Sequence, residues 1–312
     1  MSLIGGSRFQ GKQTPPAIVG HRGFRGEYPE NTLLAMRKGV EAGGVVIETD
    51  IQLAKDNVVV MCHDIDTGRC FNQDYNVEDT PYRGVLDQLH TKDSYAEKMP
   101  TLVDTCKMLL NEPAMANVRL MIDIKRSNRP HVVPFVLQAL ESVAPLNVWE
   151  KRCIFGVWKA DVMEAVNELI PSIPVAFIGI EHRTARHFME TWPKQVEAIS
   201  VSYFSLACTG GPELLEEAKQ RGVDVYSWTI NDPEAMKYAV AARLKGVITD
   251  YPDVLNQFLS SISEKDLMSE YFQSEPRIFY SYYQVFQMWS LYLLGTWYLA
   301  IADSFPWFFK RY

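Results

Sequence analysis

"AIVGHRGFRGEYPENTLLAMRKGVEAGGVVIETDIQ" occupies residues 17–52 and contains the pattern that decides the fold. An apolar, β-rich run at 17–20 is followed by a polar loop with glycine and proline, and a helical pattern then covers 31–43. Glycines end the helical pattern, and a second β-rich run follows at 45–52. Two such strands joined through a helix predict a βαβ unit, in which the strands lie parallel.

The same alternation of strand and helix continues to about residue 255. Further β-rich runs lie at 58–64, 120–125, 153–158, 173–180, 198–203, 223–230 and 246–252. Further helical patterns lie at 102–111, 131–143, 160–170, 212–222 and 232–246. This repetition predicts an α/β protein with a (β/α)8 TIM barrel fold. An open, doubly wound sheet shows the same alternation and is the alternative.

The pattern divides the chain into three parts. Residues 1–259 form the predicted barrel domain, in which the stretch at about 65–119 interrupts the alternation and is predicted to be an insertion over the top face. Residues 260–276 form a polar linker. Residues 277–312 form a hydrophobic, aromatic tail.

The tail has the composition of a membrane-associated segment. Between Ile278 and Ala302 it contains no Asp, Glu, Lys, Arg or His, a run long enough to cross a bilayer. It is also rich in Tyr, Trp and Phe, and the rings of Tyr and Trp favour the membrane–water interface. We expect a C-terminal membrane-associated aromatic helix, either a tail anchor or a helix lying in the interface. An aromatic helix that covers the barrel or forms a dimer contact is the alternative, because glutamine and serine make the run less apolar than an ordinary span.

The overall composition limits the partners and the compartment. A net charge of −7 argues against a nucleic-acid partner, because phosphate backbones are held mainly by an excess of Lys and Arg. The N-terminus lacks the apolar run of a signal peptide, and the cysteines are odd in number without a CxxC pair. We therefore expect an intracellular membrane location with the barrel facing the cytosol, on the endoplasmic reticulum, the mitochondrial outer membrane or lipid droplets.

Three carboxylates lie at positions suited to a metal ion. The two-residue period of a strand places Glu48 and Asp50 on one face of the run at 45–52, and Asp123 lies similarly on the run at 120–125. Charged side chains near the carboxyl ends of barrel strands point into the catalytic mouth. Converging carboxylates there favour a hard divalent cation, Mg²⁺ or Ca²⁺. Polarity of a solvent-facing edge is the alternative for either strand alone.

Two histidines end β-rich runs in the same way. His21 follows the run at 17–20 and His63 lies at the end of the run at 58–64, so both imidazoles are expected at the same end of the barrel. Imidazole titrates near neutral pH and can act as acid or base, so the two rings are predicted to form an acid–base pair. Asp64 is adjacent to His63, but adjacency in a strand does not make it a partner, because neighbouring side chains point to opposite faces.

Two basic residues are placed to bind a phosphate. Arg22, next to His21, offers a planar fork of donors, and Lys125 supplies a second positive charge. We assign no role to the remaining histidines, which are His90, His131, His182 and His187.

Six ordered motifs resemble those of the glycerophosphodiester phosphodiesterase family of (β/α)8 enzymes. They are "GHRG" (20–23), "PENT" (29–32), "ETDIQ" (48–52), "CHD" (62–64), "DIK" (123–125) and "YSWTIND" (226–232). The resemblance covers about residues 17–255. With its aromatic tail, the chain most resembles the fungal branch of the family that includes phosphatidylglycerol-specific phospholipase C.

The resemblance implies roles for individual residues. It implies catalysis by His21 and His63, phosphate contact by Arg22, and metal ligation by Glu48, Asp50 and the acid of the "DIK" motif. Glu30 and Asn31 match loop residues that shape the family's site, and Trp228 matches its late aromatic residue at the barrel mouth. The family usually has Glu at the position of Asp123, and the shorter side chain requires either a closer strand or a bridging water.

These features together predict a metal-dependent phosphodiesterase. We expect it to hydrolyse phosphatidylglycerol to diacylglycerol and glycerol phosphate, with His/His acid–base catalysis and a cyclic phosphate intermediate. Its partners would be a glycerol-headed phospholipid and, through residues 277–312, a membrane surface. A glycerophosphodiesterase or lysophospholipase D acting on deacylated or lyso lipids is the alternative, and an inactive lipid-binding barrel is a remote one.

Overall fold

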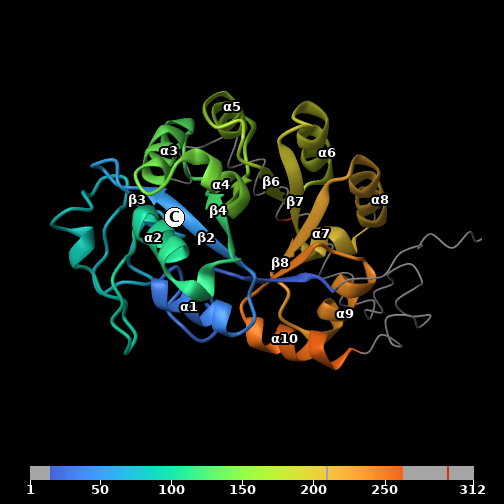
Figure 1. The fold of residues 1–312 in the computed structure, drawn as a ribbon, viewed down its shortest axis with the longest axis horizontal. Coiled ribbons are helices and arrows are strands. Elements are labelled where there is room, and N and C mark those ends of the chain that lie inside the picture. Colours follow the sequence, from blue (N-terminus) through green and yellow to red (C-terminus); the bar gives the residue numbers. More distant parts are fainter. Residues whose placement is uncertain (1–14, 209, 263–293, 295–312) are drawn as a thin grey trace, which may run out of the picture.

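A closed barrel of parallel strands forms the centre of the molecule. The computed structural model describes residues 15–208, 210–262 and 294. Within them, eight parallel strands close into a barrel, because β1 pairs with β9 on one side and with β2 on the other (Figure 1). The barrel strands are β1 (Ala17–Gly20), β2 (Val46–Leu53), β4 (Arg119–Ile124), β5 (Cys153–Val157), β6 (Val175–Gly179), β7 (Val196–Ser202), β8 (Asp224–Trp228) and β9 (Gly246–Thr249). The closure confirms the predicted TIM barrel and excludes an open sheet.

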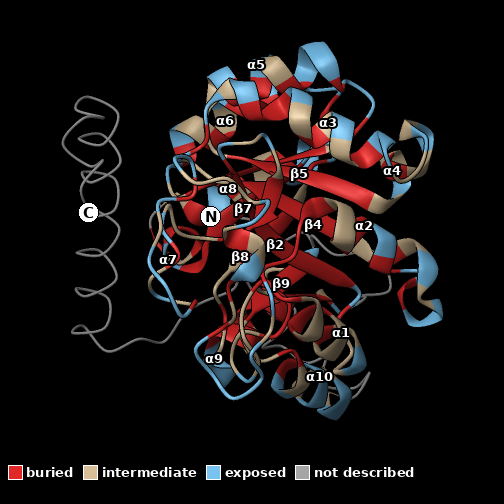
Figure 2. Ribbon diagram, turned by 90° about the vertical axis from the view of Figure 1, so that its left-hand side faces the viewer, coloured by how far each residue is buried: buried red, intermediate tan, exposed pale blue. Residues whose placement is uncertain are grey.

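Helices surround the barrel and bury one face each (Figure 2). They are α1 (Leu33–Glu41), α2 (Leu102–Asn111), α3 (Val133–Glu141), α4 (Leu146–Arg152), α5 (Ala160–Leu169), α6 (His182–Thr191), α7 (Tyr203–Ala207), α8 (Gly211–Arg221), α9 (Pro233–Ala241) and α10 (Pro252–Ser261). Helix α2 illustrates the local cause: Thr101 and Asp104 form a capping box at its start, and its buried residues share one face. Short 3₁₀ turns lie at Leu86–Gln88, Pro113–Met115 and Pro130–Val132.

The inside of the barrel is apolar at one level and acidic at the next. Each barrel strand contributes one buried side chain to an apolar floor, which consists of Val19, Val46, Met121, Ile154, Ala176, Ala198, Tyr226 and Ile248. Because side chains alternate along a strand, the next inward positions towards the carboxyl end of β2 are Glu48 and Asp50. Ile47 and Ile51, on the opposite face of β2, pack in the main core outside the barrel. The acidic residues therefore lie above a closed apolar layer.

The chain between β2 and β4 has two parts. β3 (Val59–Met61) runs antiparallel to β2, so it extends the sheet without joining the barrel. The segment up to Thr101 packs around its own small core, whose buried members are Ala54, Val60, Cys62, Phe71, Val77, Leu86, Leu89 and Met99. Its loops project at the left of Figure 1. From Leu102 onwards the chain returns to the ring of helices, where α2 contacts α3.

The predicted linker and tail fall almost entirely outside the described residues. Within 260–312 the structure describes residues 260–262 and 294. Among the described residues no single helix is long and apolar enough to span a membrane, and one bent pair, Pro130–Glu141 with Leu146–Arg152, reaches that length and composition when taken together.

Candidate active site

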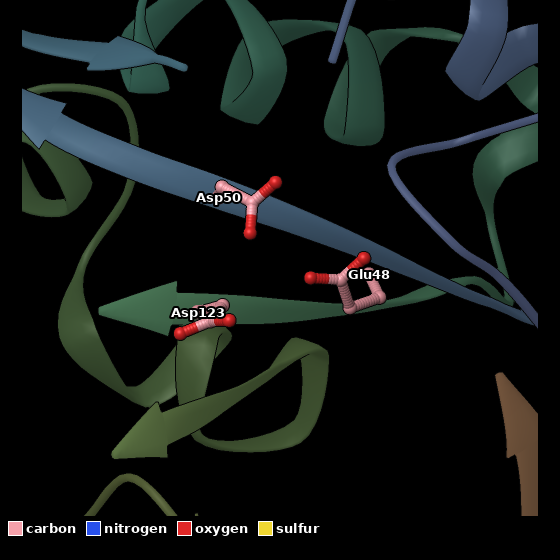
Figure 3. A group of neighbouring side chains, drawn as sticks. All are labelled: Glu48, Asp50 and Asp123. Carbon is pink, nitrogen blue, oxygen red and sulfur yellow. The ribbon is translucent and has the colours of Figure 1, made fainter. Parts of the chain in front are cut away.

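Three carboxylates meet above the apolar floor. Glu48 and Asp50 project from β2 and Asp123 projects from β4, and the two strands pair with Asp50 opposite Asp123. One oxygen from each carboxylate lies within 4.8 Å of the other two (Figure 3). All three residues are at most 4 % exposed. Direct pairing of β2 with β4 brings the shorter Asp123 close enough to join the group.

Three ionised carboxylates so close together in a buried position are unfavourable, and the pKa values of the group reflect this. Burial, together with Asp50 and Asp123, raises the pKa of Glu48 well above its ordinary value. Burial likewise raises the pKa of Asp123. Burial would also raise the pKa of Asp50, but Lys125 and Arg22 outweigh it and bring that pKa well below its usual range. A further positive charge would allow all three groups to ionise together.

Two cationic side chains border the cluster. Lys125 Nζ lies 3.1 Å from Asp123 Oδ2 and 3.3 Å from Asp50 Oδ1. Arg22 Nε lies 3.2 Å from Asp50 Oδ2. The three carboxylates and two cations leave one formal negative charge, so a divalent cation and a singly charged phosphodiester together would bring the site to neutrality. The donor set, which consists of carboxylate oxygens, fits a hard divalent cation.

His21 is held by a carboxylate from the neighbouring strand end. β1 and β9 pair with Gly20 opposite Thr249, so the next residues, His21 and Asp250, lie side by side. His21 Nδ1 lies 2.6 Å from Asp250 Oδ1, and a proton on Nδ1 leaves Nε2 as the basic nitrogen. Nε2 lies 4.0 Å from Glu48 Oε2, at the edge of the acidic cluster. Burial lowers the pKa of His21, although the Asp250 hydrogen bond opposes the shift.

His63 is held in the same manner by its own neighbour. His63 Nδ1 lies 2.6 Å from Asp64 Oδ1. The opposite-face argument from the sequence fails here, because β3 ends at Met61 and the next residues bend away from the strand. Asp50 interacts electrostatically with both imidazoles: it opposes the lowering of the pKa of His21, and His63 is among the groups that lower the pKa of Asp50. The structure thus brings the two predicted histidines to one site.

The loop between β1 and α1 supplies the remaining predicted residues. Arg22 donates its backbone N–H to Glu48 Oε2 at 2.8 Å and its Nη1–H to Glu30 Oε1 at 2.7 Å. Asn31 donates to Asp50 Oδ2 at 2.9 Å and accepts from the Thr49 hydroxyl at 2.8 Å. The loop is tightly packed on α1, since a Cβ on Gly23 would lie 2.6 Å from the backbone carbon of Ala35, and its φ of +88° also favours glycine.

Comparison with known proteins identifies the family. The model of the glycerophosphoryl diester phosphodiesterase family matches residues 21–254. The chain belongs to this family. It is therefore a phosphoric diester hydrolase.

Individual relatives of the glycerophosphoryl diester phosphodiesterase family match over most of the barrel. A glycerophosphodiester phosphodiesterase of Caldanaerobacter subterraneus is 27% identical, with 76% of this chain and 95% of that protein covered. The lysophospholipase D GDPD1 of Homo sapiens is 25% identical over 78% of this chain and 86% of its own length. Among solved structures, an Oleispira antarctica phosphodiesterase in complex with sn-glycerol-3-phosphate superposes with a TM-score of 0.69 at 21% identity, covering 79% of this chain and 98% of that one.

Two tryptophans lie beside the carboxylate cluster at the barrel mouth. The Trp228 ring lies 5.7 Å from that of Trp158 in an edge-on contact, and its indole N–H donates to the carbonyl of Ser200. Trp158 Nε1 donates to Asp123 Oδ1 at 2.8 Å, and Lys125 Nζ lies over the Trp158 ring at 5.3 Å. Trp158 therefore helps to fix the orientation of the Asp123 carboxylate.

The sequence predicts no role for several residues that the structure places at this site. They are Asp64, Arg69, Trp158, Asn231 and Asp250. Trp158 and Asp250 each come directly after a barrel strand, in the same position that singled out His21, so the strand-end rule could have found both. Arg69 lies inside the insertion, where no periodic pattern marks it.

Proposed function

We propose that the chain is a divalent-cation-dependent phosphodiesterase that converts phosphatidylglycerol to diacylglycerol and glycerol phosphate. The observation that carries the reaction is one buried group of three carboxylates flanked by two histidines, each with Nδ1 on a carboxylate. Glu48, Asp50 and Asp123 would hold Mg²⁺ or Ca²⁺. Such an ion, when bound, supplies positive charge that stabilises the phosphoryl oxygens in the transition state.

The histidines move the protons. One imidazole takes a proton through Nε2 from a hydroxyl of the substrate's own headgroup, and that oxygen forms a bond to phosphorus. The bond from phosphorus to the diacylglycerol oxygen breaks, and the other imidazole protonates the leaving oxygen. Water then opens the five-membered cyclic phosphate, and this second step returns both imidazoles to their starting states.

The remaining polar residues orient the phosphate. Arg22, whose side chain is held by Glu30 at 2.7 Å, presents a guanidinium beside the cluster, and Lys125 adds a second charge. Asn31 keeps Asp50 in place through a 2.9 Å hydrogen bond. Trp228 and Trp158 offer an apolar wall at the mouth to the uncharged part of the substrate.

This chemistry selects among lipids by the position of a free hydroxyl. In a diacyl phospholipid both backbone hydroxyls are esterified, so only a headgroup with its own vicinal hydroxyl can attack the phosphorus. Phosphatidylglycerol and phosphatidylinositol meet this condition, whereas phosphatidylcholine and phosphatidylethanolamine do not. Holding the hydroxyl in line makes the attack effectively unimolecular, which favours it strongly over attack by water.

A lysophospholipase D activity is the second candidate, and the similarity to the human protein of that name supports it. A lysophospholipid can attack through its own free backbone hydroxyl, and the headgroup alcohol then leaves. The same histidines and carboxylates would carry out this reaction. The choice between the two candidates depends on which side of the phosphate presents the hydroxyl.

A comparison of lipid classes tests the proposal. With purified full chain and Mg²⁺ or Ca²⁺, we expect diacylglycerol from phosphatidylglycerol in detergent micelles. Phosphatidyl-1,3-propanediol, which lacks the 2-hydroxyl, serves as a matched control and should react on the order of 10³-fold more slowly. Equal rates with the two lipids would overturn the cyclic route. Release of choline from lysophosphatidylcholine without cleavage of phosphatidylglycerol would establish the lysophospholipase D alternative instead.

We also propose that residues 277–312 attach the enzyme to an intracellular membrane with the barrel in the cytosol. A lipid substrate confined to a surface is met more often by an enzyme held at that surface. The candidate membranes are those of the endoplasmic reticulum and the mitochondrial outer membrane, and the surface of lipid droplets.

Membrane attachment predicts a difference between two forms of the chain. We expect carbonate-washed membranes or floated lipid droplets to retain the full chain and to release a form truncated after residue 276, because the uncharged aromatic segment is then missing. Fractionation followed by immunoblotting measures this. Recovery of the full chain in the soluble fraction would contradict the proposal.

A further inference from the structure

Arg69 links two loops at the site, one that carries Glu30 and one that carries Asp64. It projects from the insertion that follows β3. Its Nη1 and Nη2 donate to the two oxygens of Glu30 at 2.7 Å and 2.8 Å. Its Nε donates to Asp64 Oδ2 at 2.6 Å. One guanidinium therefore forms hydrogen bonds to two carboxylates from different loops.

Each of these carboxylates also contacts a residue that takes part in the proposed reaction. Asp64 holds His63 Nδ1 at 2.6 Å through its other oxygen. Glu30 accepts from Arg22 Nη1 at 2.7 Å, and Arg22 Nε lies 3.3 Å from His21 Nε2. A continuous chain of hydrogen bonds thus runs from one imidazole, through Arg69, to the other.

The electrostatics agree with this geometry. Burial would raise the pKa of Glu30, but Arg69 and Arg22 bring it down to about 2. The hydrogen bond from His63 lowers the pKa of Asp64, and Arg69 lowers it further. Both carboxylates therefore stay ionised, and a forked guanidinium satisfies them in a way that a compact ammonium cannot, because only the fork presents several N–H groups in fixed directions.

We propose that Arg69 is a positioning residue that holds the side chains of His63 and Arg22 in fixed positions relative to each other. Arg69 acts through Asp64 and Glu30, and it does not itself contact the reacting atoms. This role rests on the proposed phosphodiesterase reaction. It means that the insertion contributes a residue to that reaction. The Arg69 side chain is 45% exposed, so its removal leaves no buried cavity in the core.

Substitution of Arg69 tests this role with glycerophosphoglycerol, a soluble diester that presents the same vicinal hydroxyl. We expect Arg69→Ala to lower kcat by about 10- to 100-fold with KM changed less than about threefold, because misplacement of a catalytic group by about 1 Å has an effect of this order. Arg69→Lys should stay within about threefold of Arg69→Ala, since one ammonium cannot bridge the two carboxylates. Arg83→Ala is the matched control, because Arg83 lies in the same insertion and faces Asp56 at 3.5 Å with 76% of its side chain exposed.

A double-substitution cycle tests the link to His63. Asp64→Asn combined with Arg69→Ala should cost less than the product of the two separate losses in kcat, because both changes break the same chain. The inference would be overturned if the loss in kcat of the double variant equalled the product of the two single losses. It would also be overturned if Arg69→Ala changed KM alone or were as active as Arg83→Ala. Full activity of Arg69→Lys would overturn it as well. If Arg69→Ala fails to fold, the lysine variant decides the question. Absence of turnover by the unmodified chain on every diester would refute the proposed function, and this outcome is distinct from the others.

Discussion

Replacing His21 by alanine is expected to lower kcat by about 10²- to 10⁴-fold, the range that one positioned proton donor or acceptor contributes. His21 is the imidazole whose Nε2 lies at the edge of the carboxylate cluster, and burial lowers its pKa, which favours the basic, neutral ring. Initial rates of the proposed reaction, diacylglycerol release from phosphatidylglycerol, measure the effect. His131→Gln is the control, since His131 is exposed on a 3₁₀ turn.

A second substitution, at Asp250, separates proton transfer by His21 from the orientation of its ring. Asp250→Asn keeps an acceptor oxygen near His21 Nδ1 but removes the charge that fixes the ring, so we expect a smaller loss, of about 10²-fold. An alanine variant at His21 with unchanged turnover would show that the site is wrongly assigned. A loss in His131→Gln as large as that in His21→Ala would show that the effect comes from folding.

Replacing Glu48 by glutamine is expected to abolish metal-dependent activity while leaving the metal-free protein as stable as before. Burial and the neighbouring carboxylates raise the pKa of Glu48, so its negative charge is unfavourable when no cation is bound, and glutamine removes that charge with nearly the same shape. In the unmodified chain, a cation at about 100 times its Kd should add about 2.7 kcal/mol to the free energy of unfolding. That is a rise in Tm of about 5 to 10 °C, at about 2 to 4 °C per kcal/mol.

Thermal unfolding with and without Mg²⁺ or Ca²⁺ measures this difference directly. Glu48→Gln should lose the metal-induced rise in Tm, whereas Glu41→Gln should keep it, because Glu41 is an exposed residue at the end of α1, paired with Lys38. A full metal-induced rise in the Glu48→Gln protein would remove Glu48 from the set of ligands. A large fall in the Tm of its metal-free form would show that the carboxylate is ionised and satisfied by the protein itself.

The sequence predicts the barrel and the acidic group because both follow from local periodicity. The alternation of strands and helices requires only neighbouring residues, and the period of two places Glu48 and Asp50 together on β2. The proximity of Asp123 then follows once β2 and β4 are neighbours in a parallel sheet.

The strand-end rule can place a residue at the barrel mouth, but which side chain it contacts across the closure of the barrel does not follow from local periodicity. Asp250 meets His21 because the last strand pairs with the first, across more than 200 residues of sequence. The pairing of His63 with Asp64 depends on a bend after Met61, whereas the sequence indicates a strand that continues to residue 64. Helix α6 was not predicted either, because its polar composition, "HRTARHFMET", conceals its buried face of Ala185, Phe188 and Met189.

The apolar floor of the barrel has a consequence for the order of events. Eight packed side chains close the interior below the carboxylates, so the substrate, the attacking water and both products must all pass through the same opening. In the proposed reaction we expect the diacylglycerol to leave through that opening before water enters by it, so departure of the first product would set the earliest moment at which the second half of the turnover begins.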